Sequence, residues 1–215
     1  MNEVQECLLD FKDDGMHVCA ISLASTFSVQ GVLKKSAFED YAPIGKIGVD
    51  ELKSLIAIFK KLGSEIDISV EGNLMTVEGK NKTLIFTLMD EKYIEKPKLP
   101  ENLVHSTTVN IDAKIIRDSI NDASMNSDVT LKFITVDNGL KITNDGKYKF
   151  KRYIDTEGTK GGVEVAFGEP IKSIFDNIDD KNVELKLESD YPLLANIKND
   201  VYDITFLVAP KLDEE

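Results

Sequence analysis

Two segments with one pattern decide the fold of this chain: DELKSLIAIFKKLGSEIDISVEGNLMTVEGKNKTLIFTLMD at 50–90 and EPIKSIFDNIDDKNVELKLESDYPLLANIKNDVYDITFLVAP at 169–210. Each begins with apolar residues at helical spacing and continues with three runs of strand-forming residues separated by turn residues. Leu-Lys-Ser at 52–54 aligns with Ile-Lys-Ser at 171–173. The repeat predicts two modules, each with a short helix followed by three strands.

Strands also precede the helix in both modules. Residues 8–11 resemble residues 130–133, and each run leads into a hairpin signal, Asp14-Gly15 in the first module and Asn138-Gly139 in the second. The repeat therefore predicts an α+β fold made of two similar domains.

The second module opens with a further strand at 107–111 and an amphipathic helix at 112–124. The chain begins where the equivalent helix of the first module would end. Either that strand and helix were lost, or Met1 lies downstream of the ancestral start; a shifted alignment is the remaining alternative. Upstream coding sequence for a strand and an amphipathic helix would restore the full pattern.

The two modules are joined by a linker at 91–105, in which Pro97 and Pro100 favour an extended crossing segment over a helix. We therefore expect a first domain at 1–90, a connector at 91–105 and a second domain at 106–215.

The composition fits a globular intracellular protein. The 215 residues carry a net charge of −12, and 42% are hydrophobic, which excludes a disordered acidic tail and a disulfide mini-protein. Cys7 and Cys19 are expected to be two buried, reduced thiols. The first ten residues contain no apolar signal segment, and no apolar run approaches the roughly 20 residues of a membrane span.

Each predicted helix has one apolar and one polar side. The apolar stripes comprise Leu52, Leu55, Ile56, Phe59 and Leu62, then Ile116, Ile120 and Ala123, then Ile171, Ile174, Phe175 and Ile178. The cations on the opposite sides are Lys53, Lys60, Lys61, Lys114, Arg117 and Lys172. If all the helices line one surface, these cations form a sparse track for sequence-independent phosphate contact. Ordinary solvated lysines explain each helix taken singly.

The sequence contains no recognised catalytic or metal-binding motif. His17 and His105 lack a carboxylate or cysteine at ligand or triad spacing, and the glycines at 161–162 do not form a phosphate loop. We therefore expect no enzyme activity and no cofactor or metal.

Several stretches resemble the PCNA-type DNA sliding clamps. The run Tyr191 to Leu193 and the terminal run FLVAPKLDEE at 206–215 resemble the C-terminus of these clamps. Residues 48–62 resemble the helix of their first domain, and residues 109–124 resemble the opening of their second domain. The resemblance covers nearly the whole chain.

The resemblance implies a DNA polymerase processivity factor. Three subunits, each with two clamp domains, would close into a ring around duplex DNA, with helices lining the channel and antiparallel sheets outside. Such a ring tethers polymerase, ligase or nuclease in DNA replication and DNA repair, and a clamp loader places it on DNA. It would act in the cytoplasm of an archaeon or a virus-infected cell, or in a eukaryotic nucleus.

The resemblance also assigns residues to surfaces. Partner motifs would enter a pocket formed by Ile21, Leu99, Pro192, Leu207, Ala209 and Pro210, although core and turn positions explain these residues as well. Subunits would pair through edge strands at 83–89 and 147–154, using Thr83, Ile85, Thr87, Lys147, Lys149 and Lys151. Edge lysines also protect a sheet against aggregation.

One departure separates the chain from the resemblance, namely the missing opening strand and helix. It leaves three helices per subunit, and the outcomes that follow are a trimer with a thinner channel wall, a heteromeric ring or a monomer. The alternative function is a clamp-derived, peptide-binding scaffold that does not encircle DNA; an unrecognised enzyme is the third.

Overall fold

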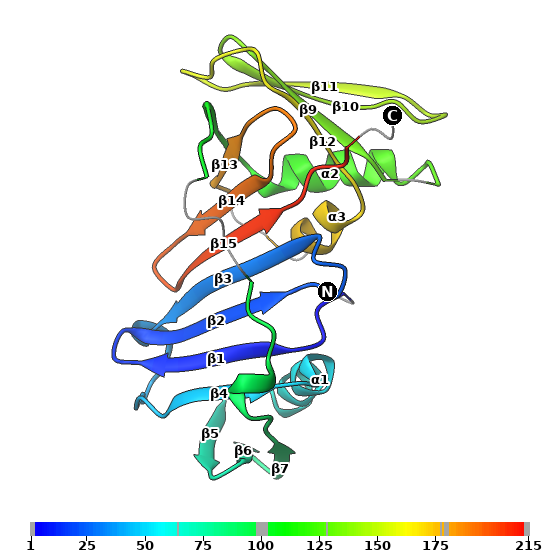
Figure 1. Ribbon diagram of the computed structural model, residues 1–215. Helices are drawn as coiled ribbons and strands as arrows, with labels where there is room; N and C mark the ends of the chain where they lie inside the picture. The colour runs from blue at the N-terminus through cyan, green and yellow to red at the C-terminus, as the bar shows by residue number, and fades with distance from the viewer. Residues whose placement is uncertain are drawn as a thin grey trace. The chain divides into compact units, whose positions relative to one another are not determined.

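The computed structural model describes residues 3–63, 65–97, 103–127, 129–176, 178 and 181–212. The chain divides into two compact units (Figure 1). The N-terminal unit comprises Asn2–Lys98 and Asp200–Tyr202, and the C-terminal unit comprises Leu99–Asn199 and Asp203–Glu215.

The N-terminal unit contains two antiparallel sheets and one α-helix. Its elements are β1 (Cys7–Lys12), β2 (Gly15–Ile21), β3 (Phe27–Lys34), a 3₁₀ turn η1 (Lys35–Ala37), β4 (Gly45–Val49), α1 (Leu52–Leu62), β5 (Ile66–Glu71), β6 (Leu74–Gly79), β7 (Lys82–Thr87) and a second 3₁₀ turn η2 (Glu91–Tyr93). Within this unit, the strand orders are β4-β1-β2-β3 and β5-β6-β7.

The C-terminal unit repeats this plan and adds a strand and a helix. Its elements are β8 (Thr107–Ile111), α2 (Ala113–Ala123), β9 (Leu131–Val136), β10 (Gly139–Asn144), β11 (Phe150–Asp155), β12 (Glu164–Phe167), α3 (Pro170–Phe175), β13 (Val183–Leu187), β14 (Leu193–Lys198) and β15 (Tyr202–Val208). The strand orders are β11-β10-β9-β12 and β15-β14-β13-β8.

The structure confirms the repeat. In both units a helix precedes three consecutive antiparallel strands, α1-β5-β6-β7 and α3-β13-β14-β15. The predicted hairpins form with two-residue loops, because Lys12 pairs with Gly15 and Val136 pairs with Gly139. The fold is therefore α+β, as the sequence predicted.

The core of the C-terminal unit lies between its helices and sheets. Helix α2 contacts β9, β10 and β11 on one side and α3 on the other. Its apolar stripe of Ile116, Ile120 and Ala123 is fully buried, as are Phe133 and Ile142 on the paired strands β9 and β10. Alternation along these strands places one apolar face under α2.

The core of the N-terminal unit is less complete. Only Leu55 of α1 is fully buried, whereas Ile56 and Phe59 are half-buried. Phe175 of α3, which the repeat aligns with Ile56, is 0% exposed. The two helices differ in burial because α3 packs against α2 in the C-terminal unit, whereas no second described helix of the N-terminal unit packs against α1.

Three local expectations differ from the structure. The connector is not wholly extended, because η2 forms at its start, where the Asp90 carboxylate accepts a hydrogen bond from the Lys92 amide at 3.1 Å. Ile178 is buried as predicted but lies beyond the end of α3. Cys19, in β2, is half-buried instead of buried.

No helix among the described residues has the length and apolar character needed to cross a membrane.

Candidate nucleic-acid and partner interfaces

The polar side of α1 presents three lysines. Lys53, Lys60 and Lys61 are exposed, and Ala57 lies exposed between them. Spacing of three and four residues places such side chains on one side of a helix, opposite the packed stripe. This part of the predicted cationic track is available for contact with phosphate.

The cations of the C-terminal unit are less uniform. Lys114 is exposed at the start of α2, just after Asp112, whose carboxylate caps the helix by accepting from the Lys114 amide at 2.8 Å. Arg117 is half-buried, and its Nη1 donates to the Ile178 carbonyl at 2.7 Å. Lys172 is also half-buried. Arg117 therefore braces α2 against the segment after α3.

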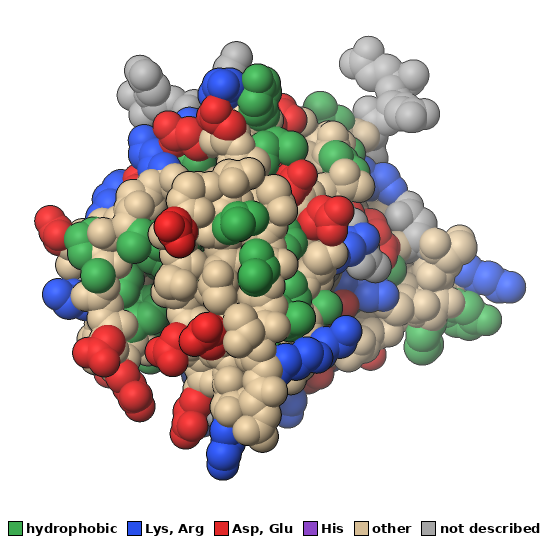
Figure 2. Space-filling view, turned by 90° about the horizontal axis from the view of Figure 1, so that it is seen from below, with side chains coloured by type: hydrophobic (Ala, Val, Ile, Leu, Met, Phe, Trp, Pro, Cys, Tyr) green, Lys and Arg blue, Asp and Glu red, His purple; other side chains and the backbone are tan. Residues whose placement is uncertain are grey.

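Acidic residues on α2 are engaged by the neighbouring sheet. Arg152 of β11 lies 2.9 Å from Asp122 and 3.8 Å from Asp118. These ion pairs reduce the negative field of the helix and fix β11 beside it. Elsewhere the signs are mixed, and Figure 2 shows acidic and basic side chains intermixed on the face that it presents.

The residues predicted for a partner-peptide pocket are found on both units. Leu207 in β15, Pro192 and Pro210 are half-buried, and Ala209 is exposed. Ile21 ends β2 of the N-terminal unit and is half-buried. Leu99 lies outside the described residues. The grouping of these residues into one pocket stays a prediction.

Two strands predicted for subunit contact lie at sheet edges. Strand β7 is an outer strand of the β5-β6-β7 sheet and exposes Thr83, Ile85 and Thr87. Strand β11 is the outer strand beside β10. It begins at Phe150, so Lys151 belongs to it, whereas Lys147 and Lys149 precede it; all three are exposed.

Large apolar side chains are exposed on both of these edges. Ile85 of β7 is 65% exposed and Tyr153 of β11 is 69% exposed. Unpaired edge strands with such side chains are templates for pairing with another chain. The sequence reasoning named Ile85 but missed Tyr153, which the alternation along KYKFKRYI puts on the same face as Lys151.

The surroundings of Cys7, Asp14 and His17 follow from local structure. Burial raises the pKa of Cys7 to about 12, which keeps it a neutral thiol. His17 and Asp14 form an exposed pair at 2.8 Å, and the hydrogen bond from His17 lowers the pKa of the Asp14 carboxyl. No metal-binding cluster of His, Cys, Asp and Glu occurs in the described part of the chain.

Comparison with solved structures identifies the fold. PCNA of A. fulgidus, in a structure with the C-terminal region of FEN-1 bound, superposes with a TM-score of 0.87 at 20% identity, over 99% of this chain and 92% of that one. PCNA of Entamoeba histolytica gives a TM-score of 0.79 at 20% identity, covering 98% and 91% of the two chains. PCNA of Thermococcus kodakaraensis gives 0.80 at 18% identity, covering 98% and 92%.

The protein has the PCNA clamp fold. The resemblance read from the sequence is thereby confirmed at the level of the fold, with the two similar α+β units that a clamp contains. No protein-family model and no curated protein sequence matches the chain. The chain thus shares this fold with its structural neighbours at a sequence identity of only 18–20%.

Proposed function

We propose that this protein is a processivity clamp, a non-enzymatic scaffold that encircles duplex DNA and tethers replication and repair enzymes. The observation that carries the proposal is the superposition on PCNA structures over nearly the whole chain. A fold shared at this identity does not specify activity, so the surfaces carry the remaining argument.

The edge strands support ring closure. A closed ring needs two different edges per subunit, so that one edge of each subunit meets the other edge of the next. Strands β7 and β11 belong to different units, lie at sheet edges and expose Ile85 and Tyr153. A homotrimer joined through these strands follows the pattern expected from the sequence.

The exposed lysines support loose contact with DNA. Lys53, Lys60, Lys61 and Lys114 are exposed on helices of a protein with a net charge of −12. A few cations contact phosphate without base readout, and an acidic remainder disfavours unproductive binding elsewhere. Sliding requires this weak contact. Partner motifs would bind near Leu207 and Pro210, as expected from the resemblance.

A topological assay tests the proposal. The protein is bound to nicked circular DNA with a clamp loader, and the complex is isolated by gel filtration at raised salt. Cutting the circle should release the protein, whereas cutting with both ends blocked by streptavidin should retain it. Retention that is independent of topology would contradict encirclement.

Variants then separate channel contacts from general charge. Lys53→Ala combined with Lys60→Ala and Lys114→Ala should shorten the lifetime on circular DNA and flatten its salt dependence. Lys198→Ala, an exposed position on β14, is the matched control and should behave as the parent protein.

The alternative is a peptide-binding scaffold that does not encircle DNA. The specific observation in its favour is the incomplete N-terminal core, in which the stripe of α1 is only half-buried. Light scattering after size exclusion distinguishes the two functions, because a stable monomer at micromolar concentration would favour the alternative.

A further inference from the structure

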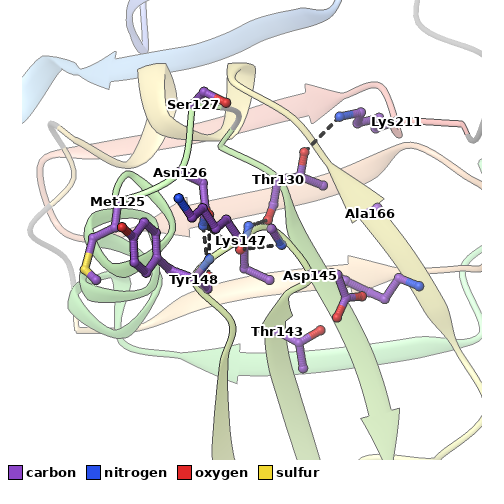
Figure 3. Close-up of a pocket in the computed structure, with 13 residues that line it drawn as sticks. Met125, Asn126, Ser127, Thr130, Thr143, Asp145, Lys147, Tyr148, Ala166 and Lys211 are labelled. Carbon is purple, nitrogen blue, oxygen red and sulfur yellow. Dashed lines mark hydrogen bonds between the residues drawn. The ribbon is translucent and has the colours of Figure 1, made fainter.

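A cavity of about 690 Å³ opens on the C-terminal unit, where it shares Lys147 with the predicted subunit edge at 147–154 (Figure 3). It is bounded by the loop after α2, the start of β9, the end of β10 with the turn that follows, β12 and the C-terminal tail. Its volume falls in the range of about 300–1,000 Å³ that is typical of ligand sites. All of its lining belongs to one unit.

Two asparagines hold the wall of the cavity in place. Asn126 donates through Nδ2 to Asn144 Oδ1 at 2.8 Å and to the Tyr148 carbonyl at 3.0 Å, and its Oδ1 accepts from the Tyr148 amide at 2.8 Å. Asn144 is buried, and its Nδ2 donates to the Thr130 carbonyl at 2.6 Å. A network that satisfies buried amides in this way makes a preformed surface.

Close packing fixes the turn and the tail as well. A Cβ atom at Gly146 would lie 2.5 Å from Cγ of Asn126, so the turn tolerates only glycine without movement. The Lys211 amide donates to the Ala166 carbonyl of β12 at 2.8 Å, which seats the tail beside the cavity. The cavity is therefore built by structured elements on every side.

The charge of the lining is opposite to that of the molecule. Lys132, Lys147 and Lys211 line the cavity together with one acid, Asp145. Lys132 also pairs with Glu164 at 2.7 Å, and Nζ of Lys211 donates to the Thr130 hydroxyl at 2.9 Å. These contacts orient two ammonium groups at the cavity. Set against Asp145 and the paired Glu164, the three lysines still leave a net positive site in a chain of net charge −12.

One end of the cavity is apolar. Met125 is 62% exposed and Tyr148 is 51% exposed, and Figure 3 shows their side chains next to each other. Nζ of Lys147 lies 5.8 Å from the centre of the Tyr148 ring. Methionine and tyrosine form adaptable contacts with an apolar side chain.

We propose that this cavity binds an acidic peptide segment of a partner protein. Carboxylates of the segment face Lys132, Lys147 and Lys211, and an apolar side chain of the segment lies on Met125 and Tyr148. Because the tail continues from Pro210 into Lys211, the cavity adjoins the residues predicted to receive partner motifs. The inference nevertheless stands without ring formation, since one unit supplies the whole site.

A peptide fits these features better than a nucleic acid. A short acidic segment experiences mainly the local lysines, because screening limits charge interactions to about 8 Å at physiological salt. The cavity also has a defined floor instead of a continuous cationic groove of the kind that tracks a nucleic-acid backbone.

Binding of a labelled peptide tests the inference. The probe is fluorescein-ELEDLE, and its neutral counterpart is fluorescein-QLQNLQ; affinity is measured by anisotropy on the full chain. Binding of the acidic probe should exceed that of the neutral probe and fall with salt. Lys147→Gln should weaken it about fivefold, as for loss of one surface ion pair, and Lys198→Gln should leave it unchanged.

The side-chain amides of Asn126 and Asn144 show where on the protein the probe binds. Their NMR signals should shift with the acidic probe in the parent protein, and Tyr148→Ser should reduce affinity with the fold retained.

Three results would overturn the proposal: equal affinity of the two probes, an unchanged Kd in Lys147→Gln, or shifts confined to other residues. Tighter binding of a dT hexanucleotide to the same amides would also overturn it, in favour of nucleic acid. Because Lys147 also belongs to the predicted subunit edge, the oligomeric state of Lys147→Gln is measured by light scattering alongside binding, so the failure of either proposal is recognisable separately.

Discussion

At the scale of single residues, the two cysteines lie on paired strands but in different surroundings. Cys19 is opposite Leu8 in the β1–β2 register, so Cys7, one residue earlier, points to the other face of the sheet. Burial raises the pKa of Cys7 to about 12, and burial also raises that of Cys19, which is only half-buried and accepts a hydrogen bond from Gln30. The two thiols cannot form a disulfide with each other without a rearrangement of the strands.

This difference predicts selective alkylation. Because the thiolate is the nucleophile, iodoacetamide should modify Cys19 first, at every pH up to about 9, and Cys7 only after unfolding. A raised folded-state pKa stabilises the protein below the unfolded pKa of the thiol, and this stabilisation is lost as the pH rises toward 12. Peptide mass spectrometry across pH 7–10, with urea-unfolded protein as the control, measures the order. Equal labelling of both cysteines in the native state would contradict it.

A second residue-scale prediction concerns the glycine beneath the cavity wall. Gly146→Ala places a methyl group 2.5 Å from Cγ of Asn126 and should lower the free energy of unfolding by about 1–3 kcal/mol. Gly168→Ala is the control, because the nearest atoms lie 3.9 Å from its Cβ position. Urea unfolding of both variants measures the difference. Equal stability of the two variants would show that the side chain of Asn126 moves to accommodate the methyl group without a loss of stability.

At the scale of elements, α1 and α3 occupy equivalent places in the repeat but are buried to different extents. Phe175→Ala in α3 removes a fully buried ring and should cost about 3–5 kcal/mol. Ile56→Ala at the aligned position of α1 should cost less than about 2 kcal/mol, because Ile56 is only half-buried. Hydrogen exchange in each variant, measured separately for the C-terminal and N-terminal units, gives the two losses in unfolding free energy. A larger loss for Ile56→Ala would mean that another segment covers α1.

The elements that the sequence predicted are those whose signals are local. Helical spacing in 50–62 and 112–124, and the Asp-Gly and Asn-Gly turns, need no distant partner and reappear in the structure within a residue or two. Tertiary contacts decided the exceptions. Arg117 resembles Lys114 on a helical wheel, yet only Arg117 is drawn inward by the Ile178 carbonyl. The cavity was missed because its lining comes from separated segments, with the turn Asn144-Asp145-Gly146 as its one local signal.

At the scale of the whole molecule, the two units differ in the completeness of their cores. Native-state hydrogen exchange should therefore show amides of β1, β2 and α1 opening at lower urea concentration than those of β9, β10 and α2. The reason is the apolar face that α2 covers in the C-terminal unit and that stays half-covered in the N-terminal unit. Mass spectrometry of exchanged peptides resolves the two groups. One common opening concentration would show that the units unfold as a single cooperative body.

Self-association of the protein depends on both edge strands, β7 and β11. Ile85→Lys on β7 or Tyr153→Lys on β11 removes an exposed apolar side chain from one edge, and either change should convert the proposed trimer to monomer. Each trimer interface pairs a β7 with a β11, so one substitution damages every interface in a homomeric ring. A mixture of the two variants still retains one intact pair of edges and should form dimers without closed trimers. Tyr93→Lys, an exposed aromatic on η2, controls for loss of surface apolarity. Analytical ultracentrifugation separates the three species, and closed trimers persisting in both single variants would place the subunit contact on other strands.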